Sequence, residues 1–227
     1  MSIHSLSANE VTDPVTQARI DLAAALRLAV LHELEEGIDN HFTVTVPGHE
    51  DRYLTLPFGL HWSEARASNL VVFNESGETL EGTGFVELSA HCIHTPIHRI
   101  TGARVVMHTH QTWALALNML KNNRLIPASQ TAVSLCDRIA YDDDYAGAAV
   151  SLVEGERVAD LIRDHDVVFM KNHGVLVVGE TVAQAYKRLY RLERACRTQL
   201  LAMTTQRELA PIPEEVIKQL KSPVPHD

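Results

Sequence analysis

Hydrophobic side chains recur along the chain with two different periods. In residues 15–36 they return every three to four positions, which predicts an amphipathic helix that Gly37 terminates. Residues 40–46 alternate between polar and apolar side chains, which predicts a strand with one buried face. A turn separates this strand from residues 53–56, which we expect to be its hairpin partner.

The rest of the chain continues as alternating strands and helices. Short apolar runs predict further strands, at residues 70–73, 105–110, 132–139, 167–170 and 175–178. Other stretches predict helices, at residues 62–68, 113–121, 156–165 and 182–205, the last with Thr181 as its N-cap. This order predicts one α/β domain over residues 15–208, between a flexible N-terminal arm at residues 1–14 and a C-terminal tail at residues 209–227.

Composition narrows the classes of function. The chain of 227 residues is 45% hydrophobic, enough for one sizeable core, and its formal net charge of -9 argues against nucleic acid or an anionic membrane as partner. Its three cysteines lack the Cys-x-x-Cys spacing of thiolate metal sites, and no apolar run is long enough for a membrane span. We therefore expect a soluble cytoplasmic protein that acts on a small molecule.

Two of the apolar runs have histidine at or just after their C-terminal ends. His108 and His110 end the first, and His173 follows the second. Positions i and i+2 of a strand face the same side, so His108 and His110 project together and one ion could bind both. A catalytic metal site typically uses three protein ligands and keeps a position open. The alternative is a chance pair among the 13 histidines of the chain.

A further group of histidines lies in residues 87–99. His91, His94 and His98 are spaced i, i+3 and i+7, which places them on one face of a helix. Pro96 predicts either a kink in this helix or a helix that begins just before the proline. The trio indicates either a pocket or a polar helix face with ordinary histidines, and the spacing does not decide between them.

Two motifs and one helix together carry a resemblance. His108-Thr109-His110, Lys171-Asn172-His173-Gly174-Val175-Leu176 and a long helix with Ala185-Tyr186 resemble the class II aldolase and adducin head-domain family. The resemblance implies a three-layer αβα domain with a mixed, largely antiparallel central sheet, often assembled as a homotetramer with active sites between subunits. It also implies that His108, His110 and His173 bind a divalent ion, zinc in the first place and manganese or iron(II) as alternatives.

The chain departs from the sugar-phosphate aldolases of that family at the catalytic carboxylate. Those enzymes carry a glutamate four residues before a histidine that corresponds to His94, and here that position is Ala90. Glu87 lies three residues away and takes the acid/base role only if the backbone shifts locally. We keep Glu87, His94 and His98 as candidate catalytic residues.

A second departure concerns phosphate. Where those aldolases have a hydroxylated Thr-Pro-Ser-Gly-like turn, this chain has Leu56-Pro57-Phe58-Gly59. A phosphorylated substrate is therefore disfavoured, and the alternative for Phe58 is a place in the core. This segment, with Asn40 and His41, resembles the adducin-like bacterial branch of the family. We take Asn40, Phe58 and Gly59 as candidate substrate-binding residues.

The leading hypothesis is a metal-dependent lyase that cleaves or decarboxylates a non-phosphorylated keto or hydroxy acid through a metal-stabilised enolate. His94 and His98 would move the proton, because an imidazole titrates near neutral pH. Two alternatives stay open. One is a non-heme iron oxygenase on the same three histidines, although iron sites usually include a carboxylate, and the other is a non-catalytic interaction module like the adducin heads.

The acidic run at residues 141–145 has two interpretations. A charge run is usually a solvated loop, and this is the interpretation that we adopt. In a homo-oligomer, Tyr141, Tyr145 and the three aspartates between them are also candidates for entering a neighbouring subunit's pocket. The spacing does not select among these side chains.

Overall fold

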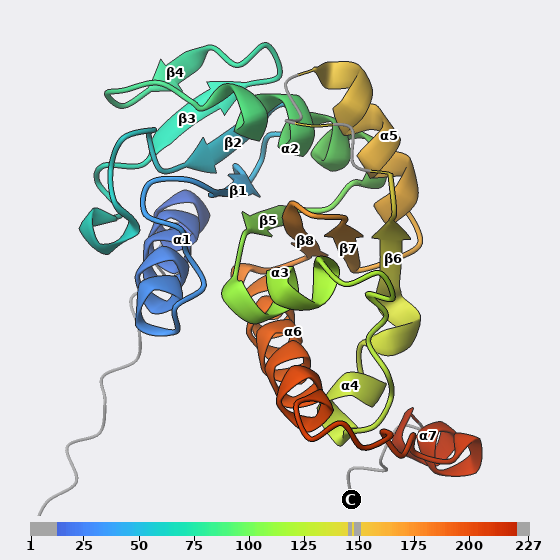
Figure 1. Ribbon diagram of the computed structural model, residues 1–227. Helices are drawn as coiled ribbons and strands as arrows, with labels where there is room; N and C mark the ends of the chain where they lie inside the picture. Colours follow the sequence, from blue (N-terminus) through green and yellow to red (C-terminus); the bar gives the residue numbers. More distant parts are fainter. Residues whose placement is uncertain (1–12, 145–146, 148–150, 222–227) are drawn as a thin grey trace, which may run out of the picture.

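A central sheet organises the molecule. The computed structural model describes residues 13–144, 147 and 151–221, and eight strands in these ranges form one sheet in the order β4-β3-β2-β1-β5-β8-β7-β6 (Figure 1). The strands are β1 (His41–Thr45), β2 (Arg52–Thr55), β3 (Val71–Asn74), β4 (Thr79–Glu81), β5 (Val105–Thr109), β6 (Ile139–Asp142), β7 (Val167–Met170) and β8 (Gly174–Gly179). Within the described ranges, β6 and β7 pair in parallel and the other neighbours pair antiparallel.

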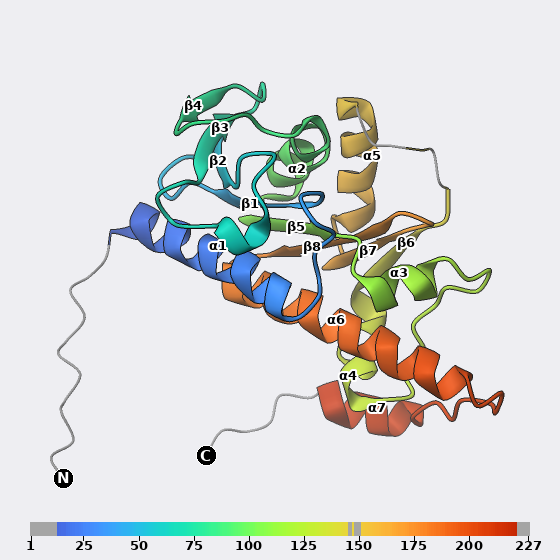
Figure 2. The same cartoon turned by 60° about the vertical axis from the view of Figure 1, so that its left-hand side comes forward.

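Helices cover both faces of this sheet (Figure 2). One layer holds α1 (Pro14–Leu31), α3 (Thr112–Asn118) and α6 (Val182–Met203), and the opposite layer holds α2 (Leu88–Thr101) and α5 (Leu152–Ile162). Shorter helices are η1 (Trp62–Glu64), α4 (Gln130–Val133), η2 (Cys136–Arg138) and α7 (Glu214–Lys221). The predicted three-layer α/β/α fold with a mixed, mostly antiparallel sheet is confirmed. None of the helices in the described ranges is long and apolar enough to cross a membrane.

The alternation of side chains along β5 divides the core into two parts. Val105 and Met107 belong to the larger cluster, together with side chains of α1 and α6. Val106 belongs to the smaller cluster, which Ile93 and Ile97 of α2 share with α5. Successive residues of a strand point to opposite faces, so the two clusters bury β5 on both sides. This packing fixes the position of the strand end that carries His108.

Several predicted elements differ from the structure in extent or in type; the predicted helix at residues 62–68, for example, is helical only over Trp62–Glu64. The first helix ends at Leu31, not at Gly37, because Glu33 takes a left-handed φ of 56° and the Leu34 N–H bonds the Ala29 carbonyl oxygen at 2.9 Å. Residues 132–139 were predicted as sheet, but the Ser129 hydroxyl accepts a hydrogen bond from the Ala132 N–H and starts α4 instead. The predictions also omitted β4.

The interpretation of residues 141–145 as a solvated acidic loop is also wrong in part. Tyr141 and Asp142 belong to β6, and Asp142 is only 6% exposed. Its carboxylate accepts hydrogen bonds from both terminal nitrogens of Arg157, at 3.0 and 2.5 Å. A buried carboxylate needs such a partner, which is why the run is not a free loop. Tyr145 lies outside the described residues.

Helix α2 is continuous through Pro96, and its neighbour α5 fits against the carbonyl that the proline leaves free. Proline has no N–H for the Cys92 carbonyl oxygen four residues earlier. A Cβ on Gly155 of α5 would lie 1.9 Å from that oxygen and 2.9 Å from the Pro96 ring. Only glycine allows the two helices to approach so closely.

We therefore expect Gly155→Ala to destabilise the protein by about 3 kcal/mol, because the added methyl group forces α5 away from α2. Urea unfolding followed by circular dichroism measures this free energy. Val153→Ala on the same helix is the matched control, since Val153 is 77% exposed and its truncation should change stability by less than about 0.5 kcal/mol. Equal stability of Gly155→Ala and the wild type would contradict the packing described here.

Candidate metal centre

Three histidines meet at one end of the central strands. His108 lies in β5, His110 follows the strand, and His173 precedes β8, which pairs antiparallel with β5. One nitrogen of each imidazole lies within 4.8 Å of the corresponding nitrogens of the other two. The predicted cluster of His108, His110 and His173 is therefore present. Among the residues that the structure describes, it is the one group of three potential ligands close enough together to hold a metal ion.

Backbone and side-chain acceptors orient two of these rings. His108 Nδ1 donates to the Val175 carbonyl oxygen at 3.0 Å, and His110 Nδ1 bonds Glu36 Oε2 at 2.5 Å. Both acceptors occupy Nδ1, so Nε2 of each ring faces the cluster, and the two Nε2 atoms lie 3.1 Å apart. Two nitrogen lone pairs at this distance repel each other unless a cation lies between them. The donor set therefore fits a divalent ion such as zinc.

The protonation state of the histidines suits metal binding. Burial lowers the pKa of His108 well below its ordinary value of 6.5, with His41, His173 and His110 as smaller contributors. Burial also lowers the pKa of His173 to about 4, and His110 adds to this shift. Both imidazoles are neutral at pH 7 and keep a free lone pair, which is the form that binds a metal ion.

A glycine brings the two strands together at the cluster. A Cβ on Gly174 would lie 2.5 Å from the Thr109 carbonyl oxygen, 2.7 Å from His110 Cδ2 and 3.2 Å from His108 Cε1. Glycine is required at position 174 because β5 and its histidines lie so close, and not because the backbone there has a positive φ. Asn172 carries the turn itself, with a left-handed φ of 56°.

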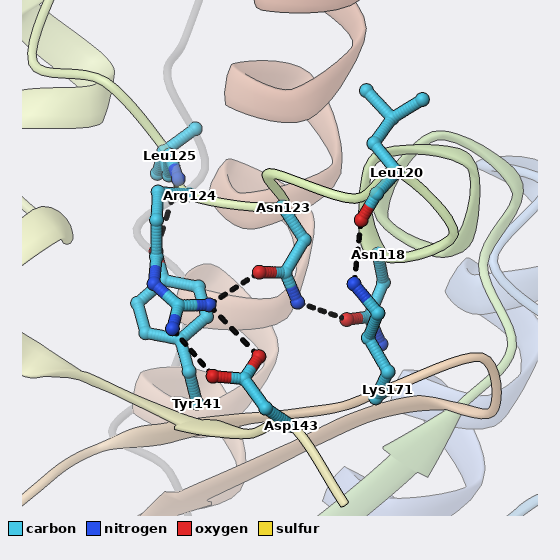
Figure 3. A network of polar contacts seen from close by, with 8 residues as sticks. All are labelled: Asn118, Leu120, Asn123, Arg124, Leu125, Tyr141, Asp143 and Lys171. Carbon is cyan, nitrogen blue, oxygen red and sulfur yellow. Dashed lines mark hydrogen bonds and ion pairs between the residues drawn. The ribbon is translucent and has the colours of Figure 1, made fainter. Parts of the chain in front are cut away.

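A polar network holds the turn that carries His173 (Figure 3). The Asn118 amide donates to the carbonyl oxygens of Met170 and Gly174, which flank the turn, and Lys171 Nζ donates to the Leu120 carbonyl oxygen at 2.5 Å. Asn118 is fully buried and in turn accepts a hydrogen bond from Asn123. This network was not predicted from the sequence, because its members come from the end of α3, the loop after it and the distant turn between β7 and β8.

The network continues to the acidic run of residues 141–144. Arg124 makes two hydrogen bonds to Asp143, at 3.0 and 2.5 Å, and lies over the Tyr141 ring at 4.1 Å from its centroid. The Tyr141 hydroxyl accepts a hydrogen bond from the Leu125 N–H. Tyr141 and Asp143 are thus engaged within the subunit, in support of the loop beside His173.

His41 is one of the site residues that sequence reasoning did not select. It pairs with His108 across β1 and β5, and the two ring centroids lie 5.1 Å apart. His41 Nε2 lies 3.2 Å from the Ser89 hydroxyl oxygen, and that hydroxyl donates to Glu87 Oε1 at 2.7 Å. The candidate Glu87 therefore reaches the histidines through Ser89 and His41. The polar alternation of residues 40–46 was the signal that could have indicated His41.

The other two candidate catalytic residues lie behind His41. His41 Nδ1 lies 2.9 Å from His94 Nε2, and Thr43 Oγ1 bridges His94 Nδ1 and His98 Nε2 at 2.8 and 2.7 Å. His94 and His98 are both buried, and burial lowers both pKa values, that of His98 to about 4. The structure thus connects His94 and His98 to the metal histidines through His41. His91 points elsewhere and contacts Thr95.

Two of the three candidate substrate residues line a small cavity beside His41. Asn40, Phe58, His41 and Glu87 line this space of about 20 Å³. Asn40 has a left-handed φ of 73°, and its Oδ1 accepts a hydrogen bond from the His110 N–H at 2.9 Å. Its amide Nδ2 is buried and has no partner in the described part of the chain. A buried donor of this kind indicates a place for a ligand atom.

Phe58 lines this cavity, whereas the third candidate, Gly59, is not among its lining residues. Phe58 is 37% exposed, and its ring centroid lies 5.7 Å from that of Phe85. Gly59 has a φ of 95° and turns the chain back toward Trp62. The ring of Trp62, not that of Phe58, is buried in the core, where it contacts Phe42.

The exposed carboxylate of Glu36 should tune metal affinity. We expect Glu36→Gln to weaken metal binding by about 10- to 100-fold, because an amide oxygen orients the His110 ring less strongly than a carboxylate does. Competition with a chelating dye measures the affinity. Glu33→Gln is the matched control, since Glu33 is exposed on the same segment and has no bond to the histidines. Unchanged affinity in Glu36→Gln would contradict this role.

The chain is similar to one known protein family over most of its length. The model of the class II aldolase and adducin N-terminal domain matches residues 20–200. The chain belongs to this family. A protein of Caulobacter vibrioides that is provisionally named a class 2 aldolase is 34% identical to this chain. The match covers 93% of this chain and 84% of the relative's chain. An aldolase II superfamily protein from Pseudomonas syringae has the same fold, with a TM-score of 0.86 and 34% identity over 93% of this chain and 85% of its own.

Members of this class II aldolase family differ in the reactions for which they are named. A 4-hydroxy-3-prenylphenylpyruvate oxygenase/4-hydroxy-3-prenylbenzoate synthase from Streptomyces roseochromogenus is 33% identical over 86% of this chain and 71% of its own. A decarboxylase from Streptomyces niveus is 32% identical over the same shares of the two chains. Family membership therefore leaves the specific reaction open, and the site itself must be considered.

Proposed function

We propose that this protein is a divalent-metal-dependent lyase that breaks a carbon–carbon bond of a non-phosphorylated keto or hydroxy acid, by aldol-type cleavage or decarboxylation. The observation that carries the proposal is the cluster of His108, His110 and His173, with two Nε2 atoms 3.1 Å apart in a member of the class II aldolase family. When bound, the ion supplies Lewis-acid stabilisation of negative charge that develops on a substrate oxygen.

The chain's own groups have separate tasks in this proposal. Val175 and Glu36 hold the metal histidines in the correct tautomer, which keeps their Nε2 lone pairs toward the ion. Asn40 Nδ2 binds a substrate oxygen in the small cavity, and Phe58 limits access of water from outside. Glu87, through Ser89 and His41, is the group that accepts and returns the proton.

The cavity supports a substrate without phosphate. The residues that line it in the described part of the chain include no lysine or arginine, and their side chains are mainly apolar. Ala90 lies in this lining, 1% exposed, at the position where the sugar-phosphate aldolases carry their glutamate. A phosphate group calls for several hydrogen-bond donors together with positive charge, and this lining offers no lysine or arginine to supply the charge.

We propose zinc as the resident ion, with manganese or iron(II) as alternatives. Three imidazoles suit all three metals, and selection among them depends on geometry and metal availability. Iron(II) would favour a second candidate function, an oxygenase. The specific observation for this candidate is the Streptomyces roseochromogenus relative, whose name includes an oxygenase activity.

Paired assays of the metal-loaded protein separate these functions. The wild type and His108→Ala are incubated with a panel of 3-oxo, 4-hydroxy-2-oxo and 2-oxo acids, and released carbonyl product, carbon dioxide and oxygen uptake are measured. The proposed lyase releases product without oxygen uptake, and His108→Ala is inactive. Oxygen uptake coupled to product would support the oxygenase instead. A wild type that binds metal and turns over none of these acids would favour a non-catalytic module.

We also propose that the chain forms a homotetramer in solution, as the family resemblance implies. Light scattering on the purified protein measures the molar mass directly. A mass of four chains supports the tetramer, and a monomer at the concentration of the activity assay would rule out an active site shared between subunits.

A further inference from the structure

An exposed pair of aromatic rings lies beside the small cavity of the candidate site. Phe58 lines that cavity and is 37% exposed, and Phe85, in the loop between β4 and α2, is 63% exposed. The two ring centroids lie 5.7 Å apart, and the ring planes are tilted by 44°. Ile38 also lines the cavity and is 43% exposed. Three large apolar side chains therefore reach the surface beside one cavity.

The backbone holds the two rings in place. The Phe58 N–H donates to the Phe85 carbonyl oxygen at 3.0 Å, and the Thr79 hydroxyl donates to the Gly84 carbonyl oxygen at 3.2 Å. A Cβ on Gly84 would lie 2.6 Å from Pro57 Cβ, so the two segments are packed as closely as glycine allows. Rings on a fixed backbone lose little freedom when a ligand binds, so the pair is a preorganised apolar surface.

The cavity connects this pair to the metal centre. Asn40 and His41 line it, and they contact the backbone of His110 and the ring of His108. Its volume of about 20 Å³ holds roughly one small polar group. A larger part of a substrate does not fit inside and must extend toward the solvent-exposed lining. Among the described residues that line the cavity, the exposed ones are Ile38 and Phe58.

We propose that Phe58, Phe85 and Ile38 determine substrate specificity by binding the tail of the acid, the part farthest from the ion, and that this tail is an aryl group. An aryl tail buries apolar surface on all three side chains and adds ring–ring contacts with the two phenylalanines. A charged tail would lose hydration there without gaining a partner. This assignment rests on the proposed function, because it concerns the other end of the same acid.

Calorimetry with two acids that differ by one phenyl group tests the tail site without turnover. The zinc-loaded wild type should bind 2-oxo-4-phenylbutanoate about tenfold more tightly than 2-oxobutanoate, because the phenyl group leaves water for the surface of Phe58 and Phe85. The comparison measures the tail alone, since both acids present the same carboxylate and keto group to the ion.

Substitutions of Phe85 connect the preference to the aromatic pair. Phe85→Ala should bind 2-oxo-4-phenylbutanoate about fivefold more weakly than the wild type and 2-oxobutanoate equally well. The exposed ring contributes little to the fold, so this variant should remain folded. Phe85→Tyr keeps the ring and should retain the preference. Leu152→Ala is the matched control, since Leu152 is 47% exposed on α5 and does not line the cavity.

Three results would overturn the tail site. Equal affinity of the wild type for both acids would remove the aryl assignment and leave the proposed lyase standing. A preference that persists in Phe85→Ala would also remove it, and a lower molar mass of that variant in light scattering would then assign the ring to a contact between two copies of the chain. Binding of neither acid would overturn the tail site and the proposed substrate class together.

Discussion

Gly174→Ala should remove the metal and destabilise the fold together. The new methyl group would lie 2.5 Å from the Thr109 carbonyl oxygen and 2.7 Å from His110 Cδ2, so either β8 moves away from β5 or the His110 ring rotates. We expect a loss of about 3 kcal/mol in the free energy of unfolding and a metal affinity at least about 100-fold lower. Urea unfolding of the metal-free protein and dye competition measure the two effects.

Val178→Ala is the control for this substitution. Val178 lies in the same strand but packs in the smaller core cluster, away from the histidines. Its truncation should cost about 1–3 kcal/mol and leave metal affinity unchanged. If Gly174→Ala were to bind metal as tightly as Val178→Ala, the close approach of the two strands would not be what shapes the site.

Acidification from pH 7 to pH 5 should come close to unfolding the protein. His41, His94, His98 and His108 are buried, and burial lowers all four pKa values, to about 3 for His41 and about 4 for His98. The unfolded chain binds protons near pH 6.5 whereas the native protein does not, so stability is full above this pH and is lost as the pH falls from 6.5 toward 4.

The size of this loss is large because these four buried imidazoles act in the same direction, and the partly buried His173, whose pKa is also lowered, adds to it. Each contributes roughly 2 kcal/mol between pH 6.5 and pH 5, and their sum of up to about 8 kcal/mol is comparable with the whole stability of a domain. Release of a metal ion on acidification acts in the same direction. Urea unfolding at pH 7 and pH 5, with chelator present throughout, measures the loss from the histidines alone.

Two variants identify the source of the pH dependence. His98→Gln should reduce the difference between pH 7 and pH 5 by about a quarter, since one of the four buried imidazoles is removed. His49→Gln should leave the difference unchanged, because His49 is exposed. A wild type equally stable at both pH values would show that the buried histidines do not titrate as their environment requires.

The two hydrophobic periods predicted most of the fold and the centre of the site. Alternation along a strand was sufficient to bring His108 and His110 to one side, and the antiparallel pairing of β5 with β8 explains why His173 joins them. The long helix at residues 182–203 was predicted almost to its ends, because Thr181 is a strong N-cap and the apolar face is continuous.

What the sequence did not reveal depends on contacts between distant segments. Glu36 reaches His110 because Glu33 ends α1 early, a local conformation that no glycine marks. His41 becomes a site residue only through its register with His108, since a strand's partner is not readable from its own alternation. Ser129 started a helix where the apolar run at residues 132–139 suggested a strand, because capping outweighed local hydrophobicity.

Elemental analysis of the untagged protein, purified without chelators, tests the metal centre most directly. We expect about one divalent ion per chain in the wild type and in the control His49→Ala, which changes an exposed histidine, and none in His108→Ala or His173→Ala. A wild type that carries no metal and takes up none of zinc, manganese or iron(II) when they are added, although it is folded, would contradict the metal centre and with it the proposed lyase.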